Sequence, residues 1–117
     1  MDSEELKNRT KQFAHRCVKL ALALPNTVLG NHIRGQLIRC GTSVASNYRA
    51  TCIAQSKASF ISKLSIVLEE TDESHFWLEF IVDEDLLIRK LVEPLLDKAN
   101  ELIAIFISSR KTDRQES

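Results

Sequence analysis

The sequence is poor in glycine and proline and has no long apolar run. Only three glycines and two prolines occur in 117 residues, which argues against a sheet with many turns and favours helices joined by short connections. The longest apolar run, Leu102 to Ile107, has six residues, whereas a membrane-spanning helix needs about 18. The charged N-terminal stretch lacks the apolar segment and cleavage site of a secretory signal. We therefore expect an all-α, cytoplasmic protein that does not span a membrane.

Motifs for catalysis and cofactor binding are missing as well. The sequence contains no HExxH, Walker A, GxGxxG or GxSxG motif, so we expect no enzyme, no cofactor and no small-molecule substrate. Asp72 and His75 have the i, i+3 spacing of helical metal ligands. The other two histidines, His15 and His32, do not follow a carboxylate at that distance. A metal-dependent enzyme is therefore the weakest alternative.

The three cysteines, Cys17, Cys40 and Cys52, have no metal-type spacing. Each falls in the apolar pattern of a predicted helix, where a free cysteine packs as a small hydrophobic residue. We expect all three to be buried, reduced thiols.

Four amphipathic segments dominate the chain, each with apolar residues at spacings of three and four. The predicted helices cover about 3–24, 27–54, 56–82 and 86–110, and a charged, frayed tail follows at 111–117. Ser3 and Ser56 are predicted helix caps. The second helix begins after Thr27 or after Asn31, and Pro94 requires a late start or a kink in the fourth. With short connections, residues 1–110 are expected to form an up-down-up-down four-helix bundle.

The charges of the chain are unevenly distributed although they sum to zero. Residues 1–67 hold ten Lys and Arg against three Asp and Glu, or +7, while residues 68–117 hold six against thirteen, or −7. A basic half can contact nucleic acid, and it can also neutralise the acidic half within a bundle or between subunits. Candidate nucleic-acid contacts on the first two helices are Lys7, Lys11, Arg16, Lys19, Arg34, Arg39 and Arg49.

The third helix has a second apolar face in addition to its core stripe. At 100° per residue, several large apolar side chains of this helix point away from the stripe that starts at Phe60. Small side chains of the second helix lie opposite its own core stripe in the same way. Exposed apolar patches mark interaction surfaces, so an oligomer interface is predicted; the alternative is that the aromatic residues are core residues displaced by a register change. The predicted interface residues are Gly35, Thr42, Ser46, Ile66, Glu73, Phe76, Trp77 and Phe80.

Two polar residues fall at positions where burial is expected. Glu73 lies among the aromatic residues and needs an arginine partner there, because an unpaired buried charge is costly. Asn47 lies in the core stripe of the second helix, where a single buried polar group can define the register of packed helices.

Several segments resemble a known family. HIRGQLIRCGTSVASNYRA, QSKASFISKLSIVLEETDESHFWLEF and ANELIAIFISSRKT are similar to the four-helix-bundle proteins encoded in intervening sequences of bacterial 23S ribosomal RNA genes. The match rests on the pattern formed by Gln36, Leu37, Arg39, Ser43, Asn47, Ser56, Phe60 and Glu73.

This resemblance implies a left-handed bundle that assembles into a ring-shaped homopentamer. It also implies a relationship to the accessory protein of diversity-generating retroelements, a basic pentamer that binds nucleic acid and a reverse transcriptase. The present chain is neutral and has Ala50, Thr51 and Ala54 where many relatives have glutamate, glycine and arginine. The leading expectation is therefore a non-enzymatic homo-oligomer with weak RNA contact, and a nucleic-acid-binding accessory factor is the alternative.

Overall fold

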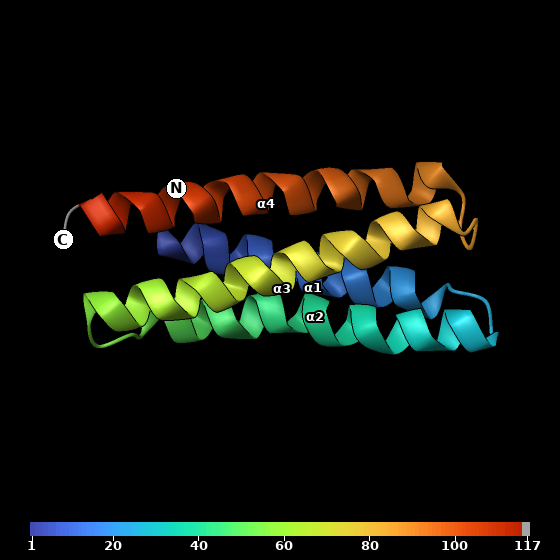
Figure 1. Cartoon of the computed structure of the whole chain (residues 1–117), viewed down its shortest axis with the longest axis horizontal. Helices are drawn as coiled ribbons and strands as arrows, with labels where there is room; N and C mark the ends of the chain where they lie inside the picture. Colours follow the sequence, from blue (N-terminus) through green and yellow to red (C-terminus); the bar gives the residue numbers. More distant parts are fainter. Residues whose placement is uncertain (116–117) are drawn as a thin grey trace.

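Four long helices run alternately up and down and pack around one core (Figure 1). The computed structural model describes residues 1–115, with side chains through residue 113. The helices are α1 (Ser3–Leu22), α2 (Val28–Cys52), α3 (Lys57–Asp83) and α4 (Arg89–Gln115). Each helix packs against the next and α4 also contacts α1, in a body whose Cα atoms extend over 47 × 20 × 19 Å. The predicted up-down-up-down four-helix bundle is confirmed.

Side-chain caps define where the helices begin. The Ser56 hydroxyl accepts a hydrogen bond of 3.0 Å from the Ser59 backbone N–H, which is the cap predicted for α3. Thr27 caps α2 in the same way, so α2 begins at the earlier of the two predicted positions. The predicted cap of α1 is wrong by one residue, because the Asp2 carboxylate accepts from Glu5 N–H at 2.8 Å. A carboxylate at this position also interacts favourably with the helix dipole.

The helix ends differ from the prediction by a few residues. The first two helices end earlier than predicted, at Leu22 and Cys52, and α4 begins late, at Arg89. The late start leaves Pro94 exposed in the second turn of α4. Asp85 has a φ of 54° and closes α3, where the Leu86 N–H bonds to the Ile81 carbonyl at 3.0 Å.

The C-terminal segment differs more from its prediction, because α4 continues to Gln115 and not only to residue 110. The expected frayed tail is therefore wrong for residues 111–115, and residues 116–117 lie outside the described part of the chain. Two contacts accompany the continuation: Thr112 donates to the Ser108 carbonyl at 3.0 Å, and Arg110 donates to Ser65 of α3 at 3.3 Å. No helix within residues 1–115 combines the length and the apolarity needed to cross a bilayer.

The core is built from one apolar stripe of each helix. Phe106 of α4 is its largest fully buried side chain and lies 5.9 Å, between ring centroids, from Tyr48 of α2. Asn47 lies at the edge of this core rather than inside it, which corrects the expectation of a buried polar residue. Its amide is half-buried and donates to the Ser43 carbonyl of its own helix at 2.9 Å. The buried polar side chains among the described residues are Thr10, Thr51, Thr71 and Ser74.

All three cysteines are free. Cys17 and Cys40 are buried as predicted, whereas Cys52 is only half-buried. The backbone of α2 approaches α1 closely at Gly41: a Cβ atom at this residue would lie 2.6 Å from Cys17 Cβ. This close approach explains why glycine is found in the middle of a long helix, where it costs about 1 kcal/mol relative to alanine.

Candidate interaction surface

Three aromatic side chains of α3 form a continuous patch on the outside of the bundle. The ring centroids of Phe76 and Trp77 are 5.0 Å apart, those of Phe76 and Phe80 5.8 Å, and those of Trp77 and Phe80 6.0 Å. His32 of α2 packs edge-on against Trp77 at 5.6 Å. Phe76 is 50% exposed, and Trp77 and Phe80 are half-buried. We name Phe76, Trp77, Phe80 and His32 the aromatic patch.

A polar network lies next to the aromatic patch and joins α2 to α3. Arg39 forms ion pairs with Glu70, at 3.3 Å, and with Glu73. Glu73 also accepts a hydrogen bond of 3.2 Å from Trp77 Nε1, and the Gln36 side chain accepts one of 3.3 Å from Arg39. The arginine partner that the sequence required for Glu73 is thus Arg39. The network leaves the carboxylate of Glu73 paired, and it holds the Trp77 ring in place.

Three residues of the family-like pattern, Gln36, Arg39 and Glu73, meet in this network. Glu73 of α3 is far in the sequence from Gln36 and Arg39 of α2, and it meets them only because α2 and α3 pack side by side. Ion pairs that are this exposed stabilise a fold by about 0 to 1 kcal/mol. We therefore interpret the network as orienting the side chains of Arg39 and Trp77, with only a small contribution to the free energy of unfolding.

The other predicted interface residues fall in different places. Ile66 is 41% exposed and lies on α3. Gly35 is exposed on α2, and a Cβ atom built on it would meet no atom within 4 Å. Thr42 and Ser46 do not lie at the aromatic patch: they are exposed on the outer face of α2 and line a groove between α2 and α1. The residues predicted to form one interface therefore lie in two places, at the aromatic patch of α3 and along the groove between α1 and α2.

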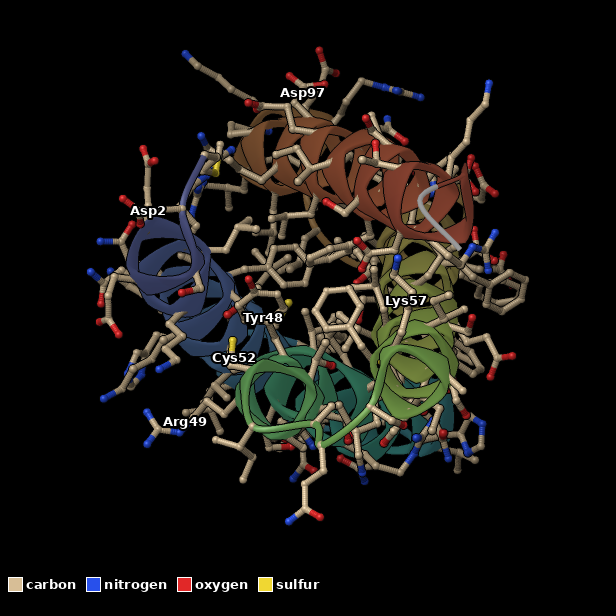
Figure 2. The ribbon with its side chains drawn as sticks, turned by 90° about the vertical axis from the view of Figure 1, so that its left-hand side faces the viewer. Asp2, Tyr48, Arg49, Cys52, Lys57 and Asp97 are labelled. Carbon is tan, nitrogen blue, oxygen red and sulfur yellow. The ribbon has the colours of Figure 1, made fainter. Side chains whose placement is uncertain are left out.

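The groove between α1 and α2 collects three of the seven predicted nucleic-acid contacts. Lys7, Lys11 and Arg49 line it, together with His15, and it encloses about 590 Å³. Figure 2 shows Tyr48 directed into the bundle and Arg49 directed away from it, on the side where α1 and α2 meet. We name this feature the basic groove. Its remaining lining consists of small or medium side chains: Ala14, Val18, Thr42, Ala45 and Ser46.

The other four candidate nucleic-acid contacts do not join this groove, so the seven basic residues do not form one continuous surface. Arg16 and Lys19 line a separate depression beside α4. Arg34 donates to the Leu24 carbonyl at 2.7 Å and so ties down the connection between α1 and α2. Arg39 is neutralised by two glutamates.

Asp72 and His75, which have the sequence spacing of helical metal ligands, lie on α3. His75 Nδ1 lies 3.4 Å from a carboxylate oxygen of Glu79, and Asp72 is exposed. Within the part of the chain that the structure describes, no three His, Cys, Asp or Glu side chains are close enough together to hold a metal ion.

Sequence reasoning missed the basic groove as a feature and missed His32 at the aromatic patch. One signal was available: Lys7, Lys11, Ala14 and Val18 follow one another at spacings of four, three and four, so they lie on one helix face. The information that was lacking is which helix packs beside that face.

The architecture and its two surfaces define the class of this protein: a small four-helix bundle with an exposed aromatic patch and a separate basic groove. The chain belongs to the 23S rRNA-intervening sequence protein family, whose family model matches residues 3–108. A similar solved structure is a protein with unknown function from the S23 ribosomal protein family of Bacteroides thetaiotaomicron. The two chains are 33% identical with a TM-score of 0.85, over 95% of this chain and 99% of that chain. A search of curated proteins found no match.

Proposed function

We propose that this chain is a non-enzymatic cytoplasmic assembly protein that associates with copies of itself, as a homopentamer, through surfaces of α2 and α3. The observation that carries this proposal is the aromatic patch, because a contiguous exposed apolar surface marks an interaction site. Aromatic residues and arginine are also the residue types enriched at the centres of protein interfaces.

The polar network supports the same proposal. Burial at an interface is costly for a charge without a partner, and Arg39, Glu70 and Glu73 are already paired within one subunit. The open space at Gly35 next to this network would let a neighbouring backbone approach closely. Burial of this surface against a neighbouring copy would therefore leave none of these three charges unpaired, and the backbone of that copy could lie close to α2 at Gly35.

Light scattering of the purified chain tests the proposal. We expect a mass of five times the 13.3 kDa of one chain, and we expect Phe76→Lys to give smaller particles with an unchanged helical circular dichroism spectrum. Phe76 is half exposed, so the substitution is tolerated in the isolated subunit, whereas a buried charge at an interface is not.

Ile53→Lys is the matched control, because Ile53 is 79% exposed and lies just beyond α2, at the end of the bundle away from the aromatic patch. This variant is expected to assemble like the parent chain. A parent chain that remains a single copy at high concentration contradicts the proposal.

A second candidate function is nucleic-acid binding, in the manner of a reverse-transcriptase accessory factor. The observation that favours it is the convergence of Lys7, Lys11 and Arg49 in one groove. Among the described residues, no phenylalanine, tyrosine or tryptophan lines that groove, so binding would rely mainly on phosphates and would fall steeply with salt.

A mobility-shift assay with structured RNA over a salt series tests this second candidate. It predicts a shift at low salt that Lys11→Glu/Arg49→Glu abolishes and that Arg16→Glu/Lys19→Glu, outside the groove, largely retains. The absence of any shift at low salt contradicts it.

A further inference from the structure

The basic groove is open to solvent and is lined by three cationic side chains, those of Lys7, Lys11 and Arg49. Lys11 and Arg49 have no acidic side chain within ion-pair distance among the described residues, and Lys7 pairs with exposed Glu4 at 3.2 Å. No carboxylate of the residues that the structure describes lines the groove. Between the cations, alanine, serine and threonine leave the space of about 590 Å³ unfilled. A helix of a partner can approach such a surface closely and bring negative charge to it.

A surface of opposite character lies on the outside of α3. Glu69, Asp72 and Phe76 follow one another at spacings of three and four residues and are all exposed, so they form one ridge. Asp83 extends the ridge by two further turns. Among the described residues, neither Glu69 nor Asp72 has an ion-pair partner. We name Glu69, Asp72, Phe76 and Asp83 the acidic ridge.

The groove lies between α1 and α2, and the ridge lies on the outside of α3. A two-fold pairing uses the same patch on both copies, so it joins ridge to groove only where both belong to one patch. A two-fold contact centred on either surface alone would place ridge against ridge, or groove against groove. Like charges brought together in this way cost several kcal/mol. A head-to-tail contact instead places the ridge of one copy against the groove of the next, and such contacts form rings when the rotation closes.

We propose that the acidic ridge of one subunit docks into the basic groove of the next copy of this chain. Carboxylates of the ridge meet Lys7, Lys11 and Arg49, and Phe76 reaches the small side chains between α1 and α2. This inference rests on the proposed self-association and gives it a direction. It also assigns a role to the charge asymmetry of the sequence, +7 over residues 1–67 and −7 over residues 68–117, because each contact joins the basic half of one copy to the acidic half of another.

Charge reversal on each side, and on both sides together, tests the proposal. The groove variant is Lys11→Glu/Arg49→Glu and the ridge variant is Glu69→Lys/Asp72→Lys; all four residues are exposed, so the helical spectrum is expected to be unchanged. Each variant alone is expected to weaken assembly at least about 100-fold, because like charges then face each other. The chain that carries all four substitutions is expected to assemble again, since its charges are complementary once more.

The outcomes separate this inference from the proposed function. A parent chain that is a single copy contradicts both. A parent chain that assembles, together with a groove variant that assembles equally well, overturns the head-to-tail contact and leaves self-association standing; the same holds when the four-substitution chain does not recover. A groove variant that keeps its assembly but loses an RNA shift assigns the groove to nucleic acid and also overturns the inference.

Discussion

Alanine at Gly30 or Gly41 is expected to lower the free energy of unfolding, while alanine at Gly35 is expected to raise it. A Cβ atom at Gly41 would lie 2.6 Å from Cys17 Cβ, and one at Gly30 would lie 2.0 Å from the Pro25 carbonyl oxygen. Both positions require movement of packed atoms, and overpacking of this kind costs about 1 to 3 kcal/mol. Gly35 has open space around it, so alanine there gains up to about 1 kcal/mol of helix propensity.

Urea unfolding followed by circular dichroism measures these differences. The three substitutions should be compared in the Phe76→Lys background, so that the assembly state does not contribute. The three glycines lie on the same helix and receive the same side chain, so propensity alone predicts the same sign for all of them. A neutral or stabilising Gly41→Ala contradicts the close contact of α1 and α2.

The second large effect is a loss of stability at alkaline pH. Burial raises the pKa of the Cys17 thiol far above its ordinary value, and the nearby Cys40 raises it further, while Arg16 acts in the opposite direction. Burial also raises the pKa of Cys40, although its hydrogen bond with Ser74 opposes this. The folded chain therefore keeps these thiols protonated where the unfolded chain loses the protons.

The direction in which the free energy of unfolding changes with pH follows from this difference in protonation. Below the unfolded thiol pKa of about 8.5, both states are protonated and stability is unaffected. Above it, the unfolded state ionises and the folded state does not, so the free energy of unfolding falls with a slope that approaches about 1.4 kcal/mol per pH unit for each such thiol.

Urea unfolding under reducing conditions between about pH 7.5 and pH 9.5 measures this slope, a range that includes the unfolded thiol pKa. Cys17→Ala is the informative variant, because it removes one titrating group. Its absolute stability is lowered by the cavity it leaves, but its free energy of unfolding is expected to fall by about 1.4 kcal/mol less than that of the parent chain over this whole pH range. Equal slopes for the parent chain and for Cys17→Ala would show that this thiol does not remain protonated in the folded state.

The sequence predicts a structural feature, such as a helix cap, correctly where that feature depends on a few neighbouring residues. Ser56 caps α3 as predicted. The end of α4 was not readable, because the charged residues after Ser109 indicate fraying by composition, whereas Arg110 contacts Ser65 of α3. The burial of Asn47 was misjudged for a related reason: helix periodicity places it near the core, but its amide bonds to the carbonyl of Ser43 in its own helix.

For the candidate surfaces, too, the sequence predicts what depends on one helix and does not predict what depends on the packing of two helices. Phe76, Trp77 and Phe80 were identified from their position on the helical wheel, since residues of one helix keep fixed angles to one another. The seven basic residues looked alike in the sequence, yet Arg39 is paired with two glutamates of α3 and Arg49 lies in a groove beside α1. These differences depend on which helix lies next to each face.

By itself the sequence determined the all-α class, the number of helices and the stripe that each helix buries, because those follow from apolar spacing and end signals within one segment. Only the tertiary structure decided that Arg39 neutralises Glu73, that Gly41 is pressed against Cys17, and that Lys7, Lys11 and Arg49 share a groove. The physical reason is that the outward faces of a helix are alike in local energy. Their partners are assigned only when each helix takes a particular rotation about its own axis to bury its apolar stripe.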